Sequence, residues 1–289
     1  MHYYENAMPA CPEADTSTLS EPEVLPTSRA ATRTIVRSGY LVERLFNTPE
    51  NNLFNHVKFH LVNDHINSGG HPMPRIMDIG CGLQVARRFL TVLNRDIRYF
   101  GIDYEATFEP DAVVDLNLPG ALEQPMDWEP DVVMLLDVLE HLHEDEKELS
   151  EVIGHVAKTM PADARLIITV PQLYRLDRFK LAHLHYPEHK IRLTQAEWRE
   201  VIEKHFDILE TQGVGYLSVL PYLPMASRRY TPENLLGRLF NHLRTHTFEK
   251  RWLKTADLFL SRTLGRVEGL KGFSNDILFV AIPRSRDHE

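Results

Sequence analysis

The sequence predicts an α/β fold built on a parallel sheet with helices on both faces. From residue 75 onward, short apolar runs of strand length alternate with amphipathic segments of helical period, which is the pattern of such a sheet. The length of 289 residues and the hydrophobic content of 43% suit one large domain with additions, or two small domains.

Two elements precede the predicted sheet. Residues 1–29 hold four prolines among Ser, Thr and Glu with almost no apolar periodicity, which predicts a disordered tail ahead of a domain over 30–289. The first helix is expected to begin at Thr48, which can cap it, with Pro49 at its first position. Gly69 and Gly70 would end this helix.

Seven segments have the length and composition of strands. Helices are expected between them near Gln84, over 144–160, and after Thr194, where Glu197 completes the spacing of a capping box. The predicted strands are Arg75–Gly80, Ile97–Asp103, Ala112–Asn117, Asp131–Asp137, Ala164–Pro171, Phe206–Thr211 and Asp276–Ile282.

The span 213–273, here called the insertion, is not needed by a minimal α/β domain. It contains ten Lys/Arg and four Asp/Glu, a net charge of +6 in a chain of −9. Two apolar stripes predict helices, the first beginning at Thr231. We expect a lid over an acceptor site, which would favour an anionic acceptor; a membrane-surface helix and a homodimer contact are the alternatives.

Charge and composition exclude several classes of protein. The excess of 41 acidic over 32 basic residues makes a nucleic-acid partner unlikely. No apolar run has the roughly 20 residues of a transmembrane segment. Two cysteines, Cys11 and Cys81, are too few for a disulfide framework, and the absence of a signal-peptide pattern predicts a cytoplasmic protein.

The ends of four predicted strands carry the groups expected of a cofactor site. Asp78-Ile79-Gly80-Cys81-Gly82 is a buried strand running into a glycine turn, where a side chain would block the approach of a ligand to the backbone. The next strand ends at Asp103, a carboxylate that can accept hydrogen bonds from both hydroxyls of a ribose. Asp115 and Asp137 follow the third and fourth strands at the same sheet edge.

These motifs, in this order and spacing, resemble class I S-adenosylmethionine-dependent methyltransferases, and Leu139-Glu140-His141 is similar to the branch of the ubiquinone-pathway O-methyltransferases. The resemblance implies a Rossmann-like, seven-stranded sheet whose last strand is antiparallel. It also implies the roles of the site residues. Asp78 and Gly80 would contact the methionine part of S-adenosylmethionine, Asp103 its ribose, and Asp115 with Leu116 its adenine, while Cys81, Gly82 and Asp137 complete the cofactor site.

Gln84 and Val85 distinguish this chain from two related patterns. Many members of the resembled family have a third glycine where Gln84 stands, so either the helix packs further from the strand or Gln84 makes a polar contact. A nicotinamide dinucleotide is disfavoured because its fingerprint asks for glycine where this chain has Val85.

Asp137, Glu140 and His141 predict the reaction site. Their spacing of i, i+3 and i+4 places them on one face beside the cofactor. They could bind a divalent cation, with His189 as a fourth ligand, or provide a base and its orienting partner. His141 is the preferred catalytic base with Glu140, because histidine has a reference pKa of about 6.5.

The same residues resemble the metal site of small-RNA 2′-O-methyltransferases that act on a 3′-terminal ribose. That resemblance implies Mg or Mn held by Asp137, Glu140, His141 and His189. The function we predict from the sequence is O-methylation of a small metabolite with S-adenosylmethionine. The alternatives are the metal-dependent methylation of an RNA ribose and the N-methylation of a small amine.

Overall fold

The computed structural model describes residues 53–284 apart from 95, 119, 123–126 and 173–187. The predicted disordered tail and the predicted helix start at Thr48 lie outside these residues. No helix within the described ranges has the length and apolar character needed to cross a bilayer.

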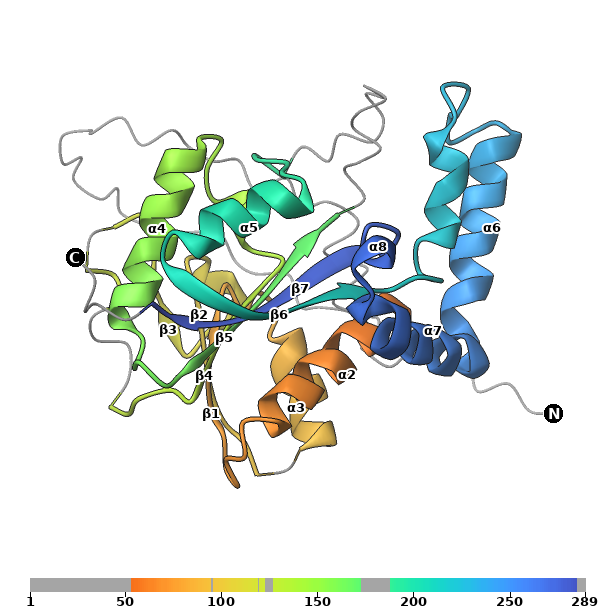
Figure 1. The fold of residues 1–289 in the computed structure, drawn as a ribbon. Coiled ribbons are helices and arrows are strands. Elements are labelled where there is room, and N and C mark those ends of the chain that lie inside the picture. Colours follow the sequence, from red (N-terminus) through yellow and green to blue (C-terminus); the bar gives the residue numbers. More distant parts are fainter. Residues whose placement is uncertain (1–52, 95, 119, 123–126, 173–187, 285–289) are drawn as a thin grey trace, which may run out of the picture. The chain divides into compact units, whose positions relative to one another are not determined.

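The strands form one seven-stranded sheet in the order β3-β2-β1-β4-β5-β7-β6 (Figure 1). β1 to β5 pair in parallel, and β7 is antiparallel to both β5 and β6. This arrangement confirms the expected sheet with its antiparallel last strand. The strands are β1 Arg75–Ile79, β2 Arg98–Asp103, β3 Ala112–Val113, β4 Val132–Leu136, β5 Arg165–Pro171, β6 Phe206–Val214 and β7 Asp276–Pro283.

β3 and β6 differ in length from their predictions. β3 was expected to reach Asn117, but it ends at Val113 because the Asp115 carboxylate accepts hydrogen bonds from the Asn117 backbone and side chain and turns the chain. β6 continues to Val214, three residues beyond its predicted end, since β7 pairs with it along its full length.

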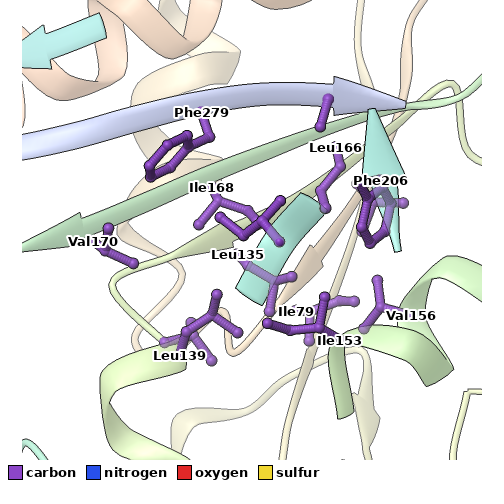
Figure 2. Packing of buried hydrophobic residues seen from close by; sticks show 14 of the residues in the cluster. Ile79, Leu135, Leu139, Ile153, Val156, Leu166, Ile168, Val170, Phe206 and Phe279 are labelled. Atoms are coloured by element: carbon purple, nitrogen blue, oxygen red, sulfur yellow. The ribbon is translucent and has the colours of Figure 1, made fainter. Parts of the chain in front are cut away.

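Helices cover both faces of the sheet. The buried apolar side chains form two clusters, one on each face. Along β5, Leu166, Ile168 and Val170 join the cluster with α4 and α5, whereas Ile167 joins the cluster with α2 and α3, as the two-residue period of a strand requires. Figure 2 shows the first cluster, where side chains of α4 meet those of the central strands. The helices are α2 Leu53–Asn67, α3 Val85–Leu93, α4 Glu146–Thr159 and α5 Gln195–Glu203.

The insertion is helical, as predicted, with elements η6 Leu220–Ala226, α6 Leu235–Glu249, α7 Arg251–Thr263, η7 Leu264–Arg266 and α8 Glu268–Lys271. The predicted start of its first helix at Thr231 is wrong. α6 begins after Asn234, whose side chain accepts a hydrogen bond from the Gly237 N–H at 3.1 Å. Asn234, and not Thr231, therefore caps this helix.

α7 joins the insertion to the sheet domain through polar and apolar contacts. The fully buried Asp257 carboxylate accepts hydrogen bonds from three consecutive backbone N–H groups, those of residues 216–218, just after β6. Leu258 packs in the cluster that contains α2, and Arg262 forms an ion pair with Asp64 of α2 at 2.8 Å. The insertion is thus anchored on α2 and on the end of β6.

Candidate functional site

The glycine turn after β1 has the geometry of a ligand-binding turn. Gly80 has φ +74° and packs so closely that a Cβ there would lie 2.6 Å from Val138 Cγ2. Gly82 has φ +50°, and a Cβ there would meet nothing within 4 Å. Packing therefore requires glycine at position 80. At position 82, glycine leaves open space beside the backbone that a ligand can occupy.

A cavity of about 190 Å³ opens beside this turn. It is lined by three residues of α2, by the turn and the start of α3, by Phe108, and by Asp137 and His141 after β4. A larger cavity of about 240 Å³ around Trp128 and Met160 has Glu129 as its one ionisable lining residue. The cavity at the glycine turn combines apolar walls with convergent charged groups at the carboxyl ends of the strands. A further cavity of about 340 Å³, lined by Arg199, Glu210, Arg266 and Lys271 among others, lies along β6, away from the glycine turn.

Asp78 lies in this cavity wall with almost no solvent exposure. Its carboxylate accepts a hydrogen bond from the Tyr99 hydroxyl. Burial raises the pKa of Asp78 to about 7, and the nearby Asp103 acts in the same direction, while Tyr99 and Lys58 oppose the shift. Near neutral pH this carboxyl group is balanced between its two protonation states, so a cationic ligand would favour the ionised form.

Asp103 lies behind Gly82 at the end of β2. Its Oδ2 accepts a hydrogen bond from the Gly82 N–H at 2.9 Å, and its Oδ1 accepts one from the Glu105 N–H at 3.0 Å. Burial raises its pKa, against these hydrogen bonds. A carboxylate oxygen can accept more than one hydrogen bond, so these contacts orient Asp103 without using all of its accepting positions. Asp103 is 6% exposed and lies behind the turn, outside the lining of the cavity.

The other predicted cofactor residues divide between the cavity and the surface. Cys81 lines the cavity, and burial raises the pKa of its thiol, which keeps it neutral. Asp115 and Leu116 do not belong to the described lining: Asp115 is exposed, and Leu116 packs against the core. Their contact with adenine stays a prediction.

Gln84 takes the polar alternative expected from the missing third glycine. It adopts φ +53°, a left-handed conformation that disfavours most side chains. Its side-chain amide donates to the Glu109 carbonyl, and its oxygen accepts from Arg87 at 2.6 Å. These bonds tie the start of α3 to the segment after β2.

Asp137, at the end of β4, is held in a strained backbone conformation with φ +56°. Its N–H donates to the Thr169 carbonyl at 3.0 Å, and its Oδ1 accepts from the Thr169 hydroxyl at 2.7 Å. Its Oδ2 accepts a hydrogen bond from Lys58 of α2. The neighbouring strand and α2 together therefore fix this carboxylate in the cavity wall.

Lys58 and Asp276 are site residues that sequence reasoning missed. Both are at most 3% exposed. Burial and the Asp137 carboxylate raise the pKa of Asp276 well above its usual value, so a protonated Asp276 can hydrogen-bond Asp137. A sequence signal for Lys58 existed, since it lies one turn after Phe54 on the apolar side of α2. No such signal placed Asp276, at the start of β7, beside β4.

Glu140, His141 and His189 come together next to the cavity. One ligand atom from each lies within 4.8 Å of the others, and the two imidazole rings meet edge to face at 4.6 Å. His141 Nδ1 lies 2.8 Å from the Glu188 carbonyl, which can only accept, so Nδ1 carries the hydrogen and Nε2 the lone pair. Asp137, the fourth predicted ligand, lies outside this group and bonds Lys58 and Thr169.

No protein-family model matches the sequence, and no curated protein matches it. Similar solved structures include the N-methyltransferase NodS of Bradyrhizobium japonicum in complex with S-adenosylhomocysteine, with 10% identity over 86% of this chain and 98% of that chain and a TM-score of 0.48. Magnesium protoporphyrin IX methyltransferase of Synechocystis has 17% identity over 80% and 84% with a TM-score of 0.45. Geranyl diphosphate methyltransferase has 12% identity over 80% and 86% with a TM-score of 0.46.

Proposed function

We propose that this chain is an S-adenosylmethionine-dependent methyltransferase that methylates a hydroxyl group of a small metabolite. The observation that carries the proposal is the convergence of a glycine turn, two buried carboxylates and a histidine at the carboxyl edge of β1, β2 and β4. Ligands of open α/β sheets bind at this edge. The open space beside Gly82 fits a cofactor that lies against the turn.

The residues around the turn suit the separate parts of this cofactor. S-adenosylmethionine supplies a methyl group on a sulfonium, which an acceptor takes by in-line displacement. Asp78 would attract the ammonium group of its amino-acid end. Asp103, oriented by the Gly82 and Glu105 N–H groups, would accept hydrogen bonds from the ribose hydroxyls. The apolar Phe59, Val85 and Ala86 line the same cavity and would contact apolar parts of the cofactor.

His141 is suited to remove the acceptor proton. It lines the cavity, and the Glu188 carbonyl holds its ring in the tautomer whose Nε2 can take a proton. Glu140 Oε1 lies 3.8 Å from that nitrogen, so its carboxyl group can stabilise the imidazolium formed. A hydroxyl acceptor needs such a base, whereas a neutral amine does not, which is why we favour oxygen over nitrogen.

Cofactor affinity should depend on pH through Asp78. Since the carboxylate must be ionised to pair with an ammonium group and its pKa is raised to about 7, affinity is expected to fall about tenfold per pH unit below 7 and to level off above it. Calorimetric titration of S-adenosylhomocysteine between pH 5.5 and 8.5 measures this.

Asp78→Asn is the matched variant, and it should bind weakly with no such slope. NAD⁺ serves as the control ligand and should produce no heat. An equal slope in wild type and variant would exclude Asp78 as the titrating group. No binding of S-adenosylhomocysteine at any pH would refute the proposed function.

The convergence of Glu140, His141 and His189 favours a second candidate, in which a divalent cation assists the methylation. Carboxylate and imidazole ligands suit Mn²⁺ and, with more oxygen donors, Mg²⁺. A bound cation would lower the pKa of an acceptor hydroxyl. The preferred acceptor would then be a chelating pair of hydroxyls, such as a vicinal diol, a catechol or a 3′-terminal RNA ribose.

Titration of Mn²⁺ into metal-stripped protein saturated with S-adenosylhomocysteine tests the second candidate. We expect stoichiometric binding that both His141→Ala and His189→Ala reduce at least tenfold, because each removes one ligand. His155→Ala, on α4, is the control and should bind as wild type does. Absence of heat would eliminate the metal and leave His141 as a base. If the protein showed no salt-sensitive binding to short RNA, an RNA ribose would be excluded as the acceptor.

A further inference from the structure

The insertion concentrates the apolar surface that the protein leaves in water. Of fourteen large apolar side chains exposed among the described residues, eight lie in 213–273, which is about a fifth of the chain. Exposed apolar side chains gathered in one segment mark an interaction surface. They are Leu220, Leu223, Leu235, Leu239, Trp252, Phe259, Val267 and Phe273.

α7 has two distinct faces. Its inner face carries the buried Asp257, Leu258 and Ser261, which hold the helix against β6 and α2. Trp252 and Phe259 lie seven residues apart and share the outer face, and each is 64% exposed. Most of the surface of each aromatic side chain therefore lies in water and not in the packing of the domain.

Basic side chains accompany these apolar ones. Arg251 stands next to Trp252 at the exposed start of α7. On α6, Leu235 is 80% and Leu239 43% exposed, and the exposed Arg238 lies between them on the same face. The insertion as a whole has a net charge of +6, although the chain has −9.

We propose that the outer faces of α6 and α7 bind the surface of an anionic lipid membrane. Helices that mix Trp, Phe and Leu with Arg and Lys on an exposed face insert their apolar side chains at the headgroup boundary and attract negative lipids. Contact with a lipid surface does not require a complementary pocket on the protein, so side chains spaced along an exposed helix are sufficient. Trp is suited to such a boundary because its ring has both apolar and polar parts.

Charge disfavours a second copy of the chain as the occupant. A twofold dimer brings the same patch of both copies together, which here would place the exposed Arg238 and Arg251 of one copy near those of the other. An anionic lipid surface neutralises this charge instead. The net charge of the rest of the chain is −15, so attraction to such a surface would also orient the insertion toward it.

Co-sedimentation with vesicles tests the proposal on the full chain. Vesicles of phosphatidylcholine with phosphatidylglycerol should bind the protein, and vesicles of phosphatidylcholine alone should bind it at least tenfold more weakly. Raising the salt concentration should weaken binding, because it screens the charges. The Trp252→Ser/Phe259→Ser and Arg238→Glu/Arg251→Glu variants should each lose more than about tenfold in partitioning.

Two control variants carry matched changes elsewhere. Val92→Ser removes an apolar side chain that is 70% exposed on α3, and Lys147→Glu reverses an exposed charge on α4; both should bind vesicles as wild type does. Binding that does not distinguish the two lipid compositions would overturn the proposal, as would equal loss in the controls. Self-association that Trp252→Ser/Phe259→Ser abolishes, without vesicle binding, would identify a second copy as the occupant and overturn it as well.

Discussion

Replacing Asp103 with alanine is expected to weaken S-adenosylhomocysteine binding by at least about 100-fold, because two hydrogen bonds to a carboxylate contribute about 1.5–3 kcal/mol each. The change also removes the acceptor of the Gly82 and Glu105 N–H groups, so the orientation of the turn is lost together with the ribose contacts. Isothermal titration of wild type and variant at pH 8 measures the loss.

Two further variants separate binding from folding in this experiment. Asp103→Asn keeps one acceptor oxygen and should bind between wild type and Asp103→Ala. Asp163→Ala removes an exposed carboxylate in the loop before β5, at the opposite edge of the sheet, and should bind as wild type does. If Asp103→Ala bound within threefold of wild type while its melting temperature was unchanged, Asp103 would have no role in holding the ribose.

Substitution of Lys58 by methionine is expected to lower the free energy of unfolding by about 3–5 kcal/mol, the cost of leaving a buried charge without its partner. Lys58 is 3% exposed and pairs with Asp137, which it helps to hold at φ +56°. Urea denaturation at pH 7.5 followed by circular dichroism measures the change. Since Asp137 lines the cavity, cofactor affinity should fall as well.

Lys147→Met is the matched control, because the Lys147 side chain is 86% exposed and pairs with Glu151. Its effect should remain within about 0.5 kcal/mol. Adding Asp137→Asn to Lys58→Met should cost less than Asp137→Asn does alone, since the two residues share one interaction. Equal effects of Lys58→Met and Lys147→Met would show that the buried ion pair does not stabilise the fold.

Local patterns in the sequence determined most of the sheet and the glycine turn at the end of its first strand. The two-residue period of the central strands and the glycines at 80 and 82 are requirements of single segments, so they can be read without the fold. The capping box of Thr194 was likewise confirmed, with both of its hydrogen bonds present. Two boundaries differ from the predicted ones by several residues, each because of the hydrogen bonds of one side chain. Asp115 ends β3 early, and Asn234 delays the start of α6.

Contacts between distant segments decided the rest of the site. Lys58, Asp137 and Asp276 are 79 or more residues apart in the chain, and only the pairing of β7 with β5 and the packing of α2 bring them together. His141 and His189 were predicted as partners, but their ring contact depends on the Lys190 and Ile191 N–H groups, which donate hydrogen bonds to the Glu140 carbonyl and hold this segment beside His141. Amphipathic stripes predicted the helices of the insertion. They did not predict which apolar side chains stay in water, because that depends on which helix faces α2 and β6 cover. The sequence by itself therefore determined the strands, most of the helices and the glycine turn after β1, because these follow from local patterns. The tertiary structure decided the charge network and the exposed surface, because burial depends on neighbours remote in the chain.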